Sequence, residues 1–427
     1  MLRRAKYLAQ TGGVALLLVT VATPVRGAGF GIFEHGAKAM GMAGAFTAQA
    51  DDGSALFHNV GGLGFLEEKE FTVGTTLIYA VDSSFEGLEP FPGTAASGEL
   101  ESSVFYPTHV YYVQPIGEDL NFGFGFNSPF GLATEWKDPA QWSGRYISAE
   151  AQLHAFDLNP SLGWRVTDKL SLGIGAVIRF STVELDRYVP AVNPFTQGVI
   201  DAATVNLKSD FDEGFGWNVG ILHRPWDRFS WGLSYRSKVK IDYAGDAEFT
   251  QLPTGNAALD AIIAGTLPFG AKLPVETAID FPALASFGVA VGLSEKALVE
   301  VDVNWTSWGD FEELEILFIE NPELSSVIPE NYDDCFNYRI GLRLDVGANQ
   351  WRFGYVFDET PQPEGSTGPL LPDADRHGFT VGFGWRDRFD IAFMYLLFDE
   401  RTTTTNYDNF FGTYDTTAWL LGATLKF

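Results

Sequence analysis

Residues 338 to 346 read Tyr-Arg-Ile-Gly-Leu-Arg-Leu-Asp-Val, and apolar and polar positions alternate along this stretch. Counted from Tyr338, every second residue is apolar, and the residues between them are charged or glycine: Arg339, Gly341, Arg343 and Asp345. Successive side chains of a strand point to opposite faces, so the stretch predicts a strand with one apolar and one polar face. A strand of a soluble sandwich could show the same pattern, and the rest of the chain decides between the two.

The alternation recurs in about fourteen segments after residue 70. We expect strands near 70–81, 104–115, 120–127, 151–166, 169–185, 211–224, 229–243, 283–294, 297–318, 335–346, 349–357, 376–386, 388–398 and 415–427. The 297–318 segment could also be two elements. An even number of strands returns both chain ends to one side, as in outer-membrane barrels. Because lipid offers no hydrogen-bond partner, such a sheet must close on itself. The expected fold is therefore an all-β, transmembrane antiparallel barrel.

The connections between these segments alternate in length. Short turns are expected near 117–119, 167–169, 225–228, 295–296, 347–349 and 386–388, and long loops near 82–103, 128–150, 186–210, 243–282, 320–334, 358–376 and 399–414. Short periplasmic turns and long external loops are typical of outer-membrane barrels. Tryptophans near the strand ends fit an interfacial girdle: Trp142, Trp164, Trp226, Trp231, Trp305, Trp308, Trp351, Trp385 and Trp419.

The N-terminus predicts export followed by a plug. Residues 1–27 combine a basic start, an apolar core too short to span a bilayer and a small-residue end, as in a signal peptide. Residues 28–69 are rich in Gly and Ala and lack strand alternation, so we expect an N-terminal hatch inside the lumen. Residues 70–427 would form the barrel. The expected location is the bacterial outer membrane.

Composition excludes several functions. The formal net charge is −27, and loss of the four Lys/Arg in residues 1–27 lowers it to −31, which argues against nucleic acid as a partner. No Gly-x-Ser-x-Gly motif accompanies the six histidines, which argues against an outer-membrane lipase. No phosphate loop is present, so transport would be passive. No cofactor or metal site is expected. The acidic cluster of residues 310–334, which includes Glu330, is interpreted as a solvated loop that could also meet lipopolysaccharide through divalent cations.

Four stretches carry a resemblance to a known family. They are the start Ala28-Gly29-Phe30, the string from Asn127 to Trp136 with Trp142, Gly144, Arg145 and Tyr146 after it, the string Leu158-Asn159-Pro160-Ser161, and the string from Phe357 to Pro363 with Leu371 to Arg376. Together the chain resembles the FadL family of outer-membrane long-chain fatty acid transporters, which includes TodX-type aromatic hydrocarbon channels.

The resemblance implies 14 strands, a hydrophobic capture groove in external loops three and four, a lumenal pocket near Phe30, and sideways exit at a kinked third strand. Apolar candidates for the groove, by position in loops 186–210 and 243–282, are Phe195, Ile262, Ile263 and Phe269. The family's hatch carries Asn-Pro-Ala, where this chain has Asn59-Val60-Gly61, so the rigidity and gating of that turn stay open.

Strand parity places several arginines in the lumen. A buried carboxylate needs a cation, so each of them could meet a substrate carboxylate: Arg165, Arg179, Arg339, Arg343 and Arg352. Lumenal arginines often pair with lumenal acids instead, and Glu300, Asp302 and Asp345 are available. The expected function is passive uptake of hydrophobic compounds, foremost long-chain fatty acids, by a monomer in the outer membrane. The alternatives are an aromatic hydrocarbon channel and a general porin.

Overall fold

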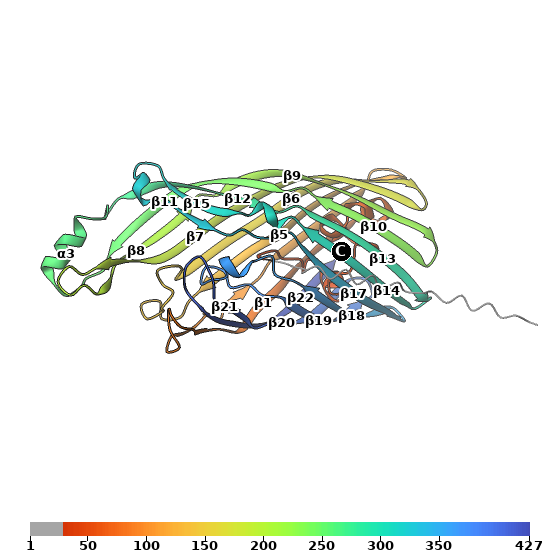
Figure 1. Ribbon diagram of the computed structural model, residues 1–427. Helices are drawn as coiled ribbons and strands as arrows, with labels where there is room; N and C mark the ends of the chain where they lie inside the picture. The colour runs from red at the N-terminus through yellow and green to blue at the C-terminus, as the bar shows by residue number, and fades with distance from the viewer. Residues whose placement is uncertain (1–28) are drawn as a thin grey trace, which may run out of the picture.

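The computed structural model describes residues 29–427, which form a closed antiparallel barrel of 14 strands (Figure 1). Around the wall the strands are β1 (Glu70–Gly87), β4 (Thr108–Pro115), β5 (Leu120–Glu135), β6 (Glu150–Thr167), β7 (Leu170–Val192), β9 (Asp212–Trp226), β10 (Phe229–Arg236), β13 (Leu284–Ser294), β14 (Ala297–Thr306), β17 (Cys335–Val346), β18 (Asn349–Asp358), β19 (Arg376–Trp385), β20 (Phe389–Phe398) and β22 (Gly412–Lys426). β22 pairs with β1 and closes the sheet. The predicted barrel is confirmed, whereas the predicted signal peptide lies outside the described residues.

The two faces of β17 agree with its sequence pattern. Ile340 is 46% exposed on the outer face, and its neighbour Arg339 is 3% exposed on the lumenal face. All six predicted short turns occur, each between two successive barrel strands at the same end of the barrel. Alternation and turn length together were therefore sufficient to place the wall.

The external loops predicted at 186–210 and 243–282 are wrong, because most of these residues form strands. β7 continues to Val192, and β8 (Val199–Ser209), β11 (Val239–Gln251) and β12 (Lys272–Phe281) extend the sheet beyond the barrel. The helix α3 (Ala257–Ala264) lies at the tip of this extension (Figure 1). Each of these strands finds a neighbour for its backbone, which satisfies the groups that a loop would leave to water.

Two long predicted strands divide. The segment predicted at 229–243 breaks into β10 and β11 at residues 237–238. The segment at 297–318 breaks into β14, the short helix η2 (Trp308–Asp310) and β15 (Glu313–Phe318). Smaller external elements are β2 (Ser97–Glu99), β3 (Val104–Phe105), η3 (Pro322–Leu324), β16 (Ser326–Pro329), η4 (Glu364–Ser366) and β21 (Arg401–Thr403).

Residues 29–69, named here the N-terminal segment, pack inside the barrel. They contain α1 (Ala37–Met40), α2 (Ala55–His58) and η1 (Val60–Phe65), drawn in red and brown within the strands of Figure 1. Nearly all residues from 35 to 64 are buried. Among residues 29–427, no helix has the length and apolar character needed to cross a membrane.

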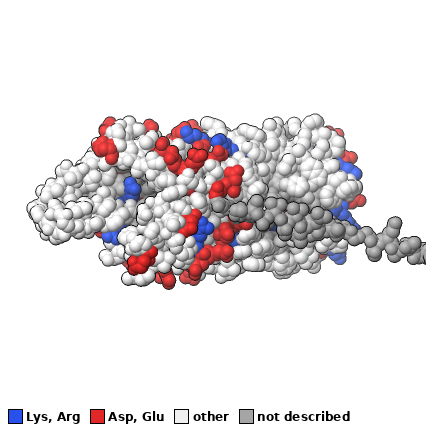
Figure 2. Space-filling view, viewed as in Figure 1, with Lys and Arg blue, Asp and Glu red and all other residues white. Residues whose placement is uncertain are grey.

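Charged side chains avoid one band of the surface. On the face in view, Figure 2 shows them gathered at the end with the short turns and at the base of the extension, with few between. Trp164, Trp226 and Trp351 are exposed, as a girdle requires. Trp142 and Trp308 are 2% and 1% exposed, so the girdle interpretation is wrong for these two, which pack on other aromatic rings.

Candidate transport site

A deep apolar cavity opens between the barrel and its extension. Its empty volume is about 890 Å³, with the open mouth included. β6, β7, β8, β11, β12 and β15 supply most of its wall, through side chains such as Leu153, Val183, Leu207 and Val275. Lumen-facing positions of a barrel are usually polar, so a run of aliphatic side chains here marks a site for an apolar ligand.

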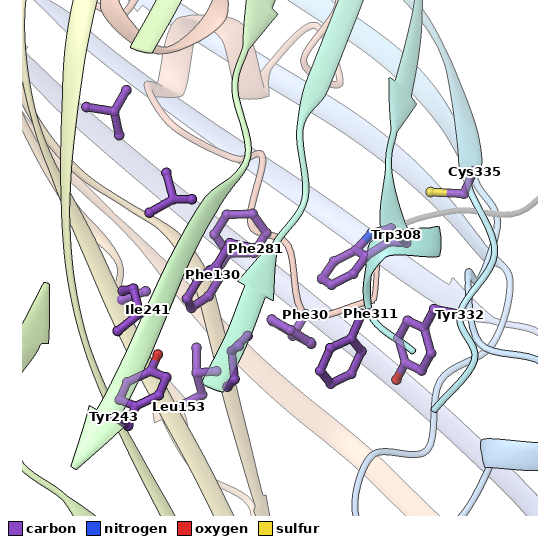
Figure 3. Packing of buried hydrophobic residues seen from close by; sticks show 14 residues of the cluster. Phe30, Phe130, Leu153, Ile241, Tyr243, Phe281, Trp308, Phe311, Tyr332 and Cys335 are labelled. Carbon is purple, nitrogen blue, oxygen red and sulfur yellow. The ribbon is translucent and has the colours of Figure 1, made fainter. Parts of the chain in front are cut away.

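A group of aromatic rings packs around Phe30 (Figure 3). Phe30 lies at their centre, with its ring centroid 4.6 Å from Trp308, 5.8 Å from Phe311 and 6.0 Å from Phe130. Phe281 packs on Phe130 at 5.0 Å. Phe30 and Phe311 line the cavity, and Phe130, Phe281 and Trp308 pack behind them in the same group of rings. These five rings are called the aromatic floor below.

A buried charge cluster lies next to the aromatic floor. Arg179 donates two hydrogen bonds to Asp157, from Nε at 2.8 Å and from Nη2 at 2.9 Å. A second arginine, Arg236, lies 3.5 Å from the same carboxylate. The Arg179 guanidinium stacks on the rings of Phe130 and Phe281 at 4.6 and 4.9 Å. Its Nη1 is buried and has no hydrogen-bond partner among residues 29–427.

The charge count of this cluster favours an anion. Two guanidinium groups share a single carboxylate, which leaves one net positive charge in a buried site. An unpaired buried charge and an orphan N–H are both costly, and a ligand oxygen at Nη1 would relieve both. Arg179 therefore pairs with a lumenal acid and still has one donor free.

The third strand of the wall, β5, is interrupted beside the aromatic floor. Its register against β6 shifts between Asn127 and Phe130. In the described part of the chain, β4 pairs with β5 only from Asn121 to Phe126. Beyond that point the N-terminal segment takes over, because Ile32 donates to the Pro129 carbonyl at 2.8 Å and Gly131 donates to the Phe30 carbonyl at 3.0 Å. Phe30 thus contacts the cavity with its ring and the break in the wall with its backbone.

Arg339 and Arg343 hold the N-terminal segment. Arg339 Nη1 donates to the Ala43 carbonyl at 2.8 Å, and Arg343 Nη1 donates to Gln49 Oε1 at 2.8 Å. Arg343 also lies 3.5 Å from Asp51. Burial alone would raise the pKa of Asp51, but Lys38 and Arg343 hold it below its usual range. Neither arginine lines the apolar cavity, so the prediction that they meet the substrate finds no support in their surroundings.

Acids of the wall bind the same segment. Asp302 accepts hydrogen bonds from the amides of Phe46 and Thr47, both at 2.9 Å. Glu300 accepts from the Ala48 amide at 2.5 Å and from Gln49 at 2.7 Å. Amides that a short irregular segment would leave orphaned are satisfied by carboxylates of β14. Below the segment, a polar cavity lined by Asp51, Arg224 and Arg343 opens toward the short turns, so the segment separates a polar from an apolar space.

The turn Asn59-Val60-Gly61 is fixed without proline. Asn59 Nδ2 donates to the carbonyls of Thr47 and Ile221 at 2.8 and 3.0 Å, and its Oδ1 accepts from the Gly61 amide at 3.0 Å. A Cβ at Gly61 would lie 2.8 Å from the backbone of Gly220 and Ile221. Val60 is buried. Side-chain hydrogen bonds and a close backbone approach therefore replace the rigidity that proline would give.

The four external candidates lie on the extension, outside the lining of the cavity. Phe195 and Ile262 are 63% and 47% exposed at its tip. Ile263 is buried with Leu259 against β8, and Phe269 packs against the same group. The structure thus keeps two of the four accessible to a ligand and uses the other two to hold α3 in place.

Sequence reasoning missed several residues of the site. Asp157, Arg236 and Tyr243 were not singled out, and Phe130 was noticed only as part of a family string. Glu330 was assigned to a solvated acidic loop, which is wrong, because it is 5% exposed and lines the cavity. Strand parity could have placed Asp157 in the lumen, two strand positions from Asn159, but parity does not reveal which lumenal groups meet.

Comparisons with known proteins agree with this architecture. Residues 18–427 match the family model described as outer membrane protein transport protein (OMPP1/FadL/TodX). A long-chain fatty acid transport protein of Escherichia coli is 25% identical over 417 residues, 92% of each chain. A 47 kDa outer membrane protein of Pasteurella multocida is 30% identical over 382 residues, 87% of each chain.

Solved structures show the same fold. A Pseudomonas aeruginosa FadL homologue superposes with a TM-score of 0.81 at 20% identity, covering 94% of this chain and 99% of the other. The Pseudomonas putida toluene transporter TodX gives 0.67 at 16% identity, with coverage of 94% and 99%. Members of this family are transport channels and not enzymes. The chain belongs to the OMPP1/FadL/TodX family of outer-membrane proteins that transport hydrophobic compounds.

Proposed function

We propose that this protein takes up long-chain fatty acids passively, through the apolar cavity and the break in β5. The observation that carries the proposal is the position of Phe30. Its ring lies in the cavity wall and its backbone occupies the break in the barrel wall. One local movement of residues 30–32 would therefore join the cavity to the lipid.

The first step of the proposed path is capture at the tip of the extension. Phe195, Ile262 and the neighbouring Val192 and Val199 are all exposed there. Exposed apolar side chains gathered at one place usually mark a binding surface. Replacement of Phe195 and Ile262 by Asp should slow uptake without altering the folded barrel, whereas Glu248→Asp on the exposed side of β11 serves as a control.

A fatty acid suits the charge cluster better than a plain hydrocarbon. In the proposed path the tail occupies the aliphatic cavity, and after the aromatic floor opens the carboxylate binds the unpartnered Nη1 of Arg179, which is buried beside Phe130 and Phe281. A charge-assisted hydrogen bond of this kind is about twice as strong as a neutral one. Toluene would gain nothing from the same donor, so the cluster supports fatty acids over aromatic hydrocarbons.

Exit into the membrane follows from the break in β5. Passage through any intact part of the wall would require two neighbouring strands to separate and lose the hydrogen bonds between them. At the break, the hydrogen bonds that join the N-terminal segment to β5 within the described residues are the two backbone bonds of Phe30 and Ile32 and the bond from His35 to the Ser128 carbonyl at 3.1 Å. Fewer bonds therefore need to open here than in a complete strand ladder. The filled lumen argues against a general porin, which would need an open polar pore.

Uptake of labelled oleate and of toluene by cells with and without the gene tests the substrate. Arg179→Lys should lower oleate uptake, because the bidentate bond to Asp157 and the free donor cannot both be kept, while toluene uptake stays unchanged. Equal losses for both compounds would contradict a carboxylate role for Arg179. If neither compound depends on the gene, the proposed substrate is wrong.

A reversible crosslink tests the exit. Gly31 and Phe130 are partners in an isolated antiparallel bridge, so cysteines at both positions in a Cys335→Ala background should form a disulfide. Oxidation should stop oleate uptake and reduction should restore it. Uptake that continues through the oxidised protein would show that the ligand leaves by another route.

A further inference from the structure

Of the three glutamates that line the cavity, Glu184, Glu276 and Glu330, the buried one is Glu330. Glu330 follows β16, and its amide donates to the Glu312 carbonyl at 2.8 Å, as does the amide of Asn331. These two bonds hold the backbone, and Glu330 lines the cavity with 5% of its surface exposed. Within residues 29–427, its carboxyl oxygens accept no side-chain or backbone hydrogen bond. Its burial was not anticipated from the acidic sequence around it.

Lys208 lines the same cavity, but its Nζ lies 2.7 Å from Glu184, and in the described part of the chain no cation acts on Glu330. The charged group that acts on it is Asp408, which has the same sign. Burial, together with Asp408, raises the pKa of Glu330 well above its usual range. A carboxyl in this setting is held in its neutral form, because an unpaired buried charge costs far more than a proton. Neutral, it offers one O–H donor and one carbonyl acceptor to whatever fills the cavity.

We propose that Glu330 is a specificity-determining residue of the cavity, which selects hydrophobic ligands with an oxygen-containing head group over plain hydrocarbons. The inference rests on the proposed function and names a residue that would discriminate among its possible substrates. A buried donor left unsatisfied by a hydrocarbon is penalised, whereas a carboxylic acid or an alcohol satisfies it. The same asymmetry lets enzymes reject ligands that lack one hydroxyl.

Glu330 and Arg179 would then act in succession. The first meets the head group in the cavity, above the aromatic floor, and the second lies beside Phe130 and Phe281 within that floor. A neutral carboxyl does not repel an incoming carboxylate and can share a proton with it through a short O–H···O⁻ bond. The head group therefore has a partner at both ends of the path.

Competition binding with three ligands of equal chain length tests this role. Decanoic acid, 1-decanol and n-decane would each displace the uncharged fluorescent probe N-phenyl-1-naphthylamine from the purified full-length protein in detergent. In the unaltered protein, the acid and the alcohol should bind more tightly than decane. Glu330→Leu should weaken 1-decanol binding about tenfold, the loss of one neutral hydrogen bond, and leave decane unchanged or tighter. Glu330→Gln keeps a donor and an acceptor and should preserve the order.

The outcomes separate this inference from the proposed function. If Glu330→Leu weakens all three ligands equally, or leaves 1-decanol unaffected, Glu330 does not read the head group. If none of the three ligands displaces the probe from the unaltered protein, the proposed function itself fails. Heat-modifiable gel mobility tests whether both variants form a folded barrel. If Glu330→Leu does not fold, the inference is tested with Glu330→Gln, in which a lost preference for 1-decanol over decane would contradict it.

Discussion

Replacement of Asn59 by alanine should release the N-terminal segment from the wall. The Asn59 side chain is fully buried and makes three hydrogen bonds, two as donor to the carbonyls of Thr47 and Ile221 and one as acceptor from the Gly61 amide. The bond to Ile221 joins the segment to β9, and the other two hold the turn in shape. Alanine has no polar atom to replace any of them.

The expected magnitude follows from these three bonds. A buried hydrogen bond contributes about 1 kcal/mol net, so losing three lowers the stability of the seated segment by about 3 kcal/mol. Each 1.4 kcal/mol is a tenfold change in an equilibrium constant, so the open population should rise about a hundredfold. The wall strands keep their own ladders, so the barrel should stay folded.

Hydrogen exchange measured by mass spectrometry reports this opening directly. Peptides that cover residues 46–66 should lose protection by about the same factor, while peptides from β17 and β18 should not change. Asn206→Ala is a suitable control, because its side chain donates to Glu184 and Asp186 in the extension, far from the segment. Unchanged protection of residues 46–66 in folded Asn59→Ala protein would refute the idea that this side chain fastens the segment.

Three further predictions concern the same barrel. Gly61→Ala should also loosen the N-terminal segment, because the added Cβ would lie 2.8 Å from the backbone of β9, and exchange of residues 46–66 should rise; normal protection would contradict the close approach. Deletion of Phe427 removes the paired backbone bonds with Phe71 at the closing seam, at 2.9 and 3.2 Å, so the yield of heat-modifiable folded barrel should fall, and an unchanged yield would count against a role in closure. Burial lowers the pKa of His58 to about 4, whereas a released histidine titrates near 6.5, so the released state binds more protons between these values. Seating of the segment should therefore weaken as pH falls from about 6.5 to about 4, seen as faster proteolysis of residues 29–69. His58→Gln should reduce this dependence but not abolish it, because burial also lowers the pKa of His35 in the same segment.

The wall could be predicted from the sequence because its pattern is local. Because one face of each strand meets lipid and the other meets the lumen, apolar and polar side chains alternate with a period of two residues. The short turns then require consecutive strands to pair as antiparallel neighbours. The extension was missed for a related reason. β8 pairs with the preceding strand β7, and β12 pairs with the preceding strand β11. The alternation of short turns and long loops typical of outer-membrane barrels assigned these segments to long external loops. Glu330 was expected to be solvent-exposed because acidic stretches usually are. Only the tertiary structure shows that Glu330 is buried in the cavity lining.

The stretch from Tyr338 to Val346 shows which features follow from the sequence and which only from the tertiary structure. Its sequence alone determined that it is a strand, which face meets lipid, and that Arg339 and Arg343 point into the lumen, because these follow from alternation between neighbours. What the two arginines bind was decided only by tertiary structure. Their partners Ala43 and Gln49 lie 296 and 294 residues away, and no local pattern encodes a contact across that distance. Barrel closure brings the N-terminal segment against β17, and the physical need to satisfy its buried carbonyl and amide groups assigns both arginines to it.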